Sequence, residues 1–302
     1  KNISSVSNRG KVVANVNAAY QSSSVVVRCL TALVLGVQRF GGLAGLIGLQ
    51  MVGVFANFFA SREMSLIPSR STIVFKKGRT VMVLFKEAMS DQKFRRRLIL
   101  RWLSTAVAVI FGLTTPFIRI ELGLSNSVVV VYSVILGISV MAASYVSKQF
   151  SDRLGSRPLV FFSTLFSLFF FMAWVLITKS VNPIWFFILG FFTNFFVALI
   201  SLLTFRLVAQ VMPDDETVAF NSMVNFVIAI IAFFVGIFSG FLADKGEIAR
   251  NLFVLDGKSA GNGYTLVFLF AIALTMIETL VASRLQEVGA YSSHEAAQVI
   301  FS

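Results

Sequence analysis

Long apolar runs separated by short charged segments dominate the chain. A helix needs about 20 apolar residues to cross the hydrocarbon core of a bilayer. Runs of about that length cover residues 12–36, 41–61, 98–118, 127–147, 159–178, 184–208, 218–242 and 264–283. None of them shows the alternation of short segments that marks a β-barrel. The pattern therefore predicts an all-α integral membrane protein with eight transmembrane helices.

The composition agrees with a membrane protein and argues against an enzyme. Of the 302 residues, 57% are hydrophobic and 13% are charged, whereas a soluble domain is about 45–50% apolar and about 25% charged. Cys29 is the only cysteine and His294 the only histidine, too few for a Cys/His metal site or a histidine-based catalytic triad. We therefore expect no enzymatic activity, no cofactor and no metal.

Positive charge is distributed unevenly between alternate connections of the predicted spans. The net charge is +12, from 26 Lys and Arg against 14 Asp and Glu. Eighteen of the basic residues fall in one set of connections, counting Arg206 at the end of the sixth span, and six in the other, while Arg28 and Arg101 lie further inside spans. Because cytoplasmic loops carry the excess of Lys and Arg, both ends of this chain are predicted to be cytoplasmic, in the plasma or inner membrane.

The densest basic stretch, residues 76–97, has two interpretations. By itself it would suggest a nucleic-acid interface. Beside a membrane span it is better explained as a topology signal that also contacts anionic headgroups. We expect the lipid bilayer, and not nucleic acid, as its partner.

An internal repeat links the two ends of the chain. Lys11–Asn15, at the entry to the first span, matches Thr217–Asn221, at the entry to the seventh, in its valine and asparagine. Ala60–Arg62 matches Ala282–Arg284 at the exits of the second and eighth spans. The two matches are separated by different numbers of residues, and the long loop 243–263 accounts for the difference. Spans one and two then correspond to spans seven and eight. We expect about four further helices before the first residue, which gives twelve helices in two repeats of six.

A short motif lies between spans four and five. It reads Ser151-Asp152-Arg153-Leu154-Gly155-Ser156-Arg157-Pro158, and it resembles the Asp-Arg-x-Gly-x-Arg loop signature of the major facilitator superfamily of transporters. Phe94–Arg97 and Gly240–Asp244 are also similar to segments of this family. Lys148 departs from the pattern, because the family usually has glycine four residues before the aspartate. The resemblance covers nearly the whole chain.

The resemblance implies a two-bundle fold and secondary active transport of a small solute by alternating access. It divides the chain into helices five and six (1–61), a basic cytoplasmic linker (62–97), a C-terminal six-helix bundle (98–287) and a cytoplasmic tail (288–302). It also implies a monomer. An ATP-driven permease subunit and a polytopic receptor or channel are the alternatives. The sequence has no Walker-type nucleotide loop, and a receptor or channel does not predict the repeat.

The signature implies a gating role for Asp152, Arg153, Gly155 and Arg157. A helix N-terminus favours an anion such as Asp152, and the two arginines can bridge to neighbouring helix ends. Such a cluster can hold helices together in one state and release them in another. The alternative is a simple turn with positive charge on the cytoplasmic side.

A polar stripe runs along the first span. Asn17, Gln21, Ser24 and Arg28 recur at helical spacing on one face. Lipid does not satisfy polar groups, so this face meets water, another helix or a solute, and the resemblance places it beside the central cavity. Arg28 is the first candidate for contact with an anionic solute, because its planar guanidinium suits carboxylates and phosphates. Pairing with an acidic residue, or reaching outward to the membrane surface, is the alternative.

Four further polar residues lie inside predicted spans. Glu278 is a candidate for binding a coupling proton or sodium ion, because an ionisable group in a membrane span is costly unless it functions. The resemblance places it on the peripheral twelfth helix, which favours an acid satisfied by a neighbour or by reaching the surface. Asn194, Asn221 and Asn225 are candidates for the solute cavity, with hydrogen bonding between helices as the alternative.

Cysteine labelling tests the predicted orientation. Loops 62–97 and 148–157 should face the cytoplasm, and loop 243–263 should face outward. A membrane-impermeant thiol reagent applied to intact cells should therefore label Gly261→Cys but not Ser69→Cys, each in a Cys29→Ser background. Labelling at position 69, or none at position 261, would show the topology to be wrong.

Overall fold

Six of the eight predicted spans lie in the part of the chain that the structure describes. The computed structural model describes residues 51, 55, 59, 81–177, 181–212, 217–246, 248, 254–255, 258–259 and 262–285. Within these residues, six helical stretches are long and apolar enough to cross a membrane. They are α4 (Gln92–Gly112) continued by α5 (Thr114–Pro116) and the π-helix η2 (Phe117–Glu121), α6 (Asn126–Leu154), α7 (Ser156–Val175), α8 (Pro183–Ala209), α9 (Thr217–Asp244) and α11 (Thr265–Ser283). Predicted spans three to eight are confirmed, whereas spans 12–36 and 41–61 lie outside the described residues apart from positions 51, 55 and 59, which are helical.

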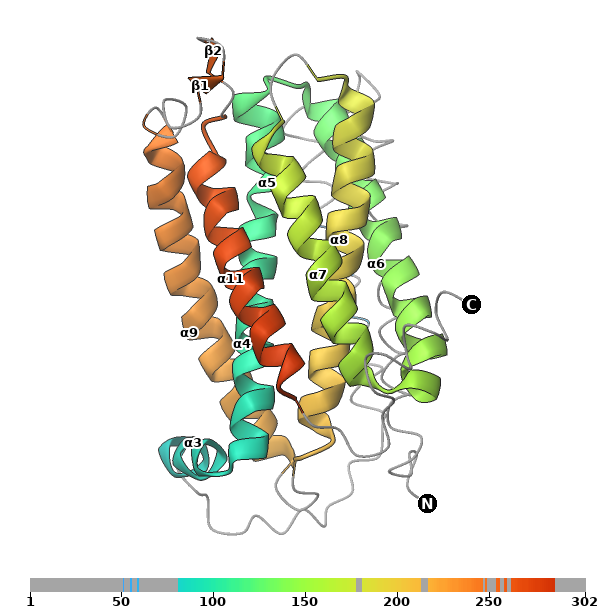
Figure 1. Cartoon of the computed structure of the whole chain (residues 1–302), viewed down its shortest axis with the longest axis vertical. Helices are drawn as coiled ribbons and strands as arrows, with labels where there is room; N and C mark the ends of the chain where they lie inside the picture. The colour runs from blue at the N-terminus through green and yellow to red at the C-terminus, as the bar shows by residue number, and fades with distance from the viewer. Residues whose placement is uncertain are drawn as a thin grey trace.

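The long helices stand side by side in one bundle (Figure 1). Helix α8 packs against α4, α6 and α7, and α11 packs against α4 and α7. Helix α9 lies against α4 at one edge of the bundle. The shorter helix α3 (Val81–Ser90) lies across one end of the bundle (Figure 1). Two short strands, β1 (Val254–Leu255) and β2 (Lys258–Ser259), pair antiparallel between α9 and α11.

Helix starts and stops follow local capping residues. The Asp91 side chain accepts a hydrogen bond of 2.8 Å from the backbone N–H of Lys93, so α4 begins at Gln92, six residues before the predicted span at 98. The hydrophobic pattern misses this start because it excludes the basic residues that follow the cap. Asn182 caps α8 in the same way, with Pro183 in the first turn, where its missing N–H costs nothing.

Helix α4 is interrupted near one face of the membrane. It ends at Gly112, and the chain continues through the short helix α5 into the π-helical turn η2. Pro116 has no N–H to donate to the carbonyl of Gly112 one turn earlier, which removes one bond of the helical ladder. The missing bond coincides with the change from α-helix to π-helix at Phe117.

Two apolar clusters fill the bundle between α4, α7, α8 and α11. One is built from aromatic side chains, with Phe117 packed edge-to-face against Trp174 and Phe268 at centroid distances of 5.9 and 5.5 Å. The other is aliphatic and includes Leu100, Leu203 and Ala282. Each draws residues from several helices, so the clusters hold those helices as one unit.

Close contact between α6 and α8 depends on a glycine. A Cβ atom at Gly190 would lie 2.8 Å from the hydroxyl oxygen of Tyr132 and would also meet its ring. The absence of that atom lets the fully buried Tyr132 ring fit between the helices, where its hydroxyl donates a 3.0 Å hydrogen bond to Thr114. Small residues at helix contacts allow such close approach in membranes.

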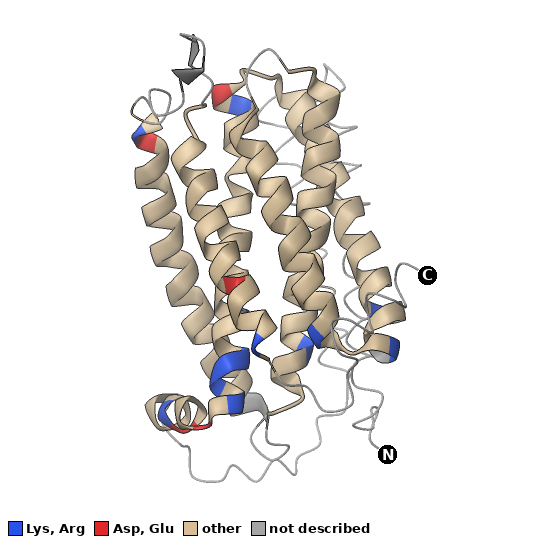
Figure 2. Cartoon of the chain, in the orientation of Figure 1, with Lys and Arg blue, Asp and Glu red and all other residues tan. Residues whose placement is uncertain are grey.

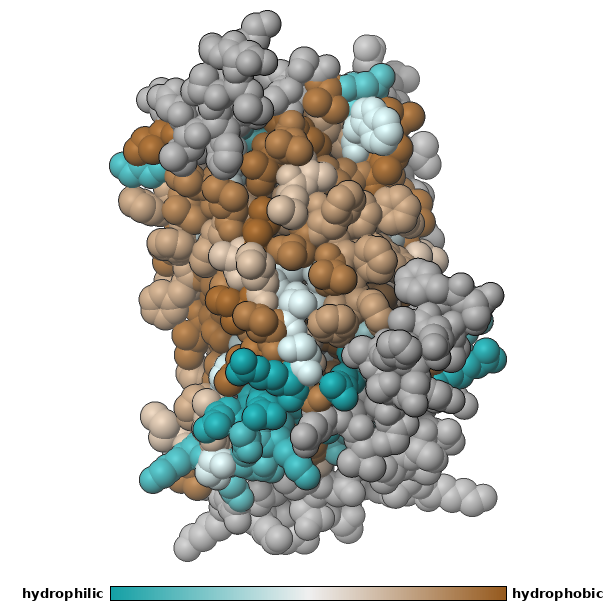
Figure 3. Space-filling model, viewed as in Figure 1, coloured by the Kyte–Doolittle hydropathy of each residue, from teal (hydrophilic) through white to brown (hydrophobic). Residues whose placement is uncertain are grey.

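The described surface has an apolar belt and a polar end. Figure 3 shows hydrophobic residues over the middle of the bundle and hydrophilic ones gathered at the end where α3 lies. Only 6% of the most apolar stretch of α9 is buried, against 50% for α7. Exposed phenylalanines on α9, such as Phe226, Phe233 and Phe241, suit a lipid-facing surface.

Candidate functional site

Basic residues gather at the end of the bundle that carries α3 (Figure 2). This end is formed by the starts of α4 and α7 and the ends of α6, α8 and α11. Its described basic residues are Lys86, Lys93, Arg95, Arg96, Arg97, Arg101, Lys148, Arg153, Arg157, Arg206 and Arg284, whereas Arg119 and Lys245 stand at the other end.

Arginines at the basic end cap the C-terminus of α11. The last carbonyls of a helix have no partner within the helix. Arg96 of α4 donates to the carbonyl of Arg284 at 3.1 Å, and Arg157 of α7 donates to the carbonyl of Ser283 at 3.3 Å. A cation also suits the negative end of the helix dipole. Two other helices therefore hold the end of α11 in place.

The signature loop lies within this set of contacts. Gly155 is the single residue between α6 and α7, and its φ of 86° favours glycine. Ser151, at the end of α6, accepts a hydrogen bond from Arg206 of α8. Arg157 bonds to α11 as described, and Arg153 is exposed. The Asp152 side chain lies outside the described residues.

Two more arginines of α4 bond to α8. Buried Arg97 donates to the carbonyl of Leu207 at 2.9 Å, near the C-terminus of α8. Arg101, one turn further into the membrane, donates to both the carbonyl and the hydroxyl of Ser201, at 2.9 and 2.8 Å. Its guanidinium also lies 5.9 Å from the centre of the Phe205 ring. No role was predicted for Arg101 from the sequence, although a charge within a span requires a partner.

An asparagine has the corresponding role at the opposite end. The side chain of Asn262, before α11, donates to the carbonyl of Trp174 in the last turn of α7 at 3.2 Å and to that of Ile177 just beyond it at 3.0 Å. Its own oxygen accepts from the backbone N–H of Tyr264 at 2.9 Å. Burial, together with the charges of Glu121 and Asp244, raises the pKa of Tyr264. The sequence contains no signal for Asn262, because its partners are far away in the chain.

The structure places Asn194 between helices. Its amide donates to the carbonyl of Leu136 at 2.8 Å and to the hydroxyl of Ser139 at 2.7 Å, both on α6. These bonds match the interhelical alternative considered for this residue. Asn221 is half-buried and Asn225 exposed on α9. The other cavity candidates, Asn17, Gln21, Ser24 and Arg28, lie outside the described residues.

Glu278 is fully buried in the middle of the bundle. It lies on the inner face of α11, one turn from Ala282 of the aliphatic cluster, and its side chain does not reach the surface. Neither carboxyl oxygen has a hydrogen-bond partner among the described residues. Ser104, one turn from Leu100 of the same cluster, also has a buried hydroxyl that lacks a partner in this part of the chain. A buried carboxyl with these surroundings is the most unusual chemical feature of the described bundle.

Substitution of Asn194 separates a packing role from a solute-binding role. Asn194→Leu removes both bonds to α6, so we expect a lower melting temperature and a loss of about 0.6–1.7 kcal/mol of stability, as for other interhelical bonds in membranes. Asn225→Leu, the same change at an exposed site, should shift stability by no more than about 0.5 kcal/mol. Thermal unfolding of the purified variants measures both. A stable Asn194→Leu protein would contradict the packing role.

Comparison with known proteins identifies the family. Residues 1–236 match the family model described as Major Facilitator Superfamily. A comparison with curated proteins finds no match. The family match covers well over half of the 302 residues, and the membrane-length helices of the structure agree with it. The chain therefore belongs to the major facilitator superfamily, whose members are transporters.

Proposed function

We propose that the protein is a secondary active transporter, which moves a small solute by alternating access between two bundles. The family match carries the assignment to a transporter. Alternating access needs a bundle that moves as a unit. The hydrogen bonds that join α8 to α4 and to α6 support such rigidity. So does the 3.0 Å hydrogen bond that Trp174 of α7 donates to Thr193 of α8.

The basic end of the bundle is proposed to be cytoplasmic and to contain a latch. Its excess of Lys and Arg fits the positive-inside rule, with both ends of the chain inside and the protein in the plasma or inner membrane. Arg157 and Ser151 of the signature loop bond to α11 and α8. In the proposed latch, Asp152, Arg153, Gly155 and Arg157 bias the two conformations by about 1–3 kcal/mol.

The solute is proposed to be a small anion. The polar stripe of Asn17, Gln21, Ser24 and Arg28 supports this, because a guanidinium in the membrane needs an anionic or polar partner. Asn221 and Asn225 are proposed to contribute to the same cavity. The transporter is proposed to act as a monomer.

Glu278 is proposed to carry the coupling cation. An ionised carboxylate without a partner is very costly in an apolar interior, and Glu278 has no partner in the described bundle. Binding of a proton neutralises the carboxylate and removes that cost; a sodium ion would do so only together with further oxygen ligands. In the proposed cycle, a local opening beside α11 in one of the two conformations exposes the carboxyl to one side of the membrane, where the cation exchanges.

An untargeted flux experiment tests this function even though the solute is unidentified. Liposomes containing the purified full-length protein are filled with a deproteinised extract of small metabolites, and mass spectrometry follows what leaves under an imposed proton or sodium gradient. We expect gradient-dependent release of a solute that carries a carboxylate or phosphate, without ATP. Release that requires ATP, or no difference from protein-free liposomes, would contradict the proposal.

The coupling role is tested in the same assay. Glu278→Gln removes the charge but keeps the shape, so the solute should still equilibrate while its gradient-driven accumulation is lost. Glu121→Gln, the same change at the end of the bundle, should leave accumulation intact. If Glu278→Gln accumulates solute normally, or fails to fold, the carboxyl does not carry the cation.

A further inference from the structure

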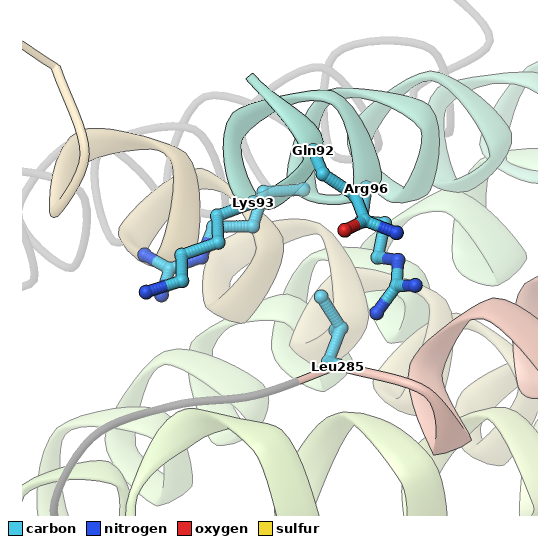
Figure 4. A pocket seen from close by; sticks show the side chains of 5 residues that line it. Gln92, Lys93, Arg96 and Leu285 are labelled. Atoms are coloured by element: carbon cyan, nitrogen blue, oxygen red, sulfur yellow. The ribbon is translucent and has the colours of Figure 1, made fainter.

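A small basic pocket opens where α4 begins and α11 ends. It is lined by Gln92, Lys93, Arg96, Arg97 and Leu285. Figure 4 shows Lys93 and Arg96 extending on opposite sides of it, with Gln92 above and Leu285 below. The pocket therefore combines cationic and amide donors with an apolar floor.

The charges around the pocket favour an anion. Arg97 is held by its bond to α8, and Arg96 donates from one nitrogen of its guanidinium to α11. Among the described residues, the other N–H donors of Arg96 remain available. Lys93 is exposed. On the α4 side of the pocket the acidic groups nearest in sequence are Asp91, whose oxygen accepts from the backbone N–H of Lys93, and Glu87, which is exposed on α3. On the α11 side, Glu287 follows Leu285 by two residues and lies outside the described residues. The described residues that line the pocket thus include three cations and no carboxylate.

The neighbouring helix α3 places the pocket at the membrane surface. Leu84 and Ala88 bury one face of α3 in a cluster with residues of α4 and α9. Met82 and Val83 on its free surface are 71% and 52% exposed. A short helix that lies across the bundle end with exposed apolar residues is typical of the interface between headgroups and acyl chains. Since α3 leads directly into α4, the pocket lies at the same depth.

We propose that this pocket binds the headgroup phosphate of an anionic phospholipid, held by Lys93 and Arg96. The cavity volume is about 70 Å³, far below the about 300–1,000 Å³ of clefts that enclose whole small molecules. A pocket of this size suits one charged group of a ligand, with the rest of the ligand outside the pocket. Basic residues at the membrane surface attract anionic lipids by about 1 kcal/mol each. The inference does not depend on the transported solute.

Lipid titration of the full-length chain tests the site. Native mass spectrometry of the delipidated protein in detergent measures binding of phosphatidylglycerol, with phosphatidylcholine as the neutral comparison. We expect Lys93→Gln to weaken the first phosphatidylglycerol about fivefold, with little change for phosphatidylcholine. Lys245→Gln, the same charge change at the other end of the bundle, should have no effect. Arg96→Gln combined with Lys93→Gln should weaken binding further.

Three outcomes would overturn the proposal. Wild-type protein that binds both lipids equally would show no anionic headgroup site. Equal losses in Lys93→Gln and Lys245→Gln would show a general effect of net charge. Full competition by inorganic phosphate would assign the pocket to a free anion rather than to a lipid. Loss of the Arg96 bond to α11 could destabilise the double variant. In that case the single Lys93→Gln variant decides the result.

Discussion

Polar groups inside a membrane protein must find their partners within the protein, because the hydrocarbon core supplies no water. In the described bundle this constraint determines which helices are joined. Helix α8 exchanges side-chain hydrogen bonds with α4 through Arg101, with α6 through Asn194 and with α7 through Trp174. The apolar clusters fill the space between the helices, but the directional bonds fix how they are arranged. A bundle joined in this way is suited to move as one body.

The same constraint operates at the helix ends, and a few buried groups, Glu278 among them, do not meet it within the described residues. Arg96, Arg157 and Asn262 supply donors to terminal carbonyls of neighbouring helices. The basic end therefore contributes to packing, in addition to the orientation in the membrane proposed from its charge. Glu278 lies in the same bundle without a partner among the described residues. An ionisable group that lacks a partner inside a membrane bundle is a candidate for function.

Hydrophobic length predicted the six described spans, because long apolar helices are required by the bilayer itself. It misplaced the start of α4, where the cap at Asp91 determines the boundary. The signature loop identified the turn at Gly155, but its contacts with α8 and α11 depend on segments far apart in the chain. Asn262 gave no signal because its partners are also distant in the chain. The hydrogen bonds from Asn194 of α8 to α6 could be recognised only with both helices in place. Helical periodicity identifies which face is polar, whereas packing determines what that face meets.

The central claim is that the C-terminal bundle moves as a rigid unit against the other bundle. Electron–electron distance measurements between spin labels test it most directly. Labels at Ile184, at the start of α8, and at Lys245, directly after the end of α9, should give one distance under all conditions. A second pair of labels joins Arg39, in the predicted outer loop between the first two spans, to Lys245. This pair should give two distances, whose populations change with an ion gradient. Two distances within the bundle, together with one between Arg39 and Lys245, would contradict the claim.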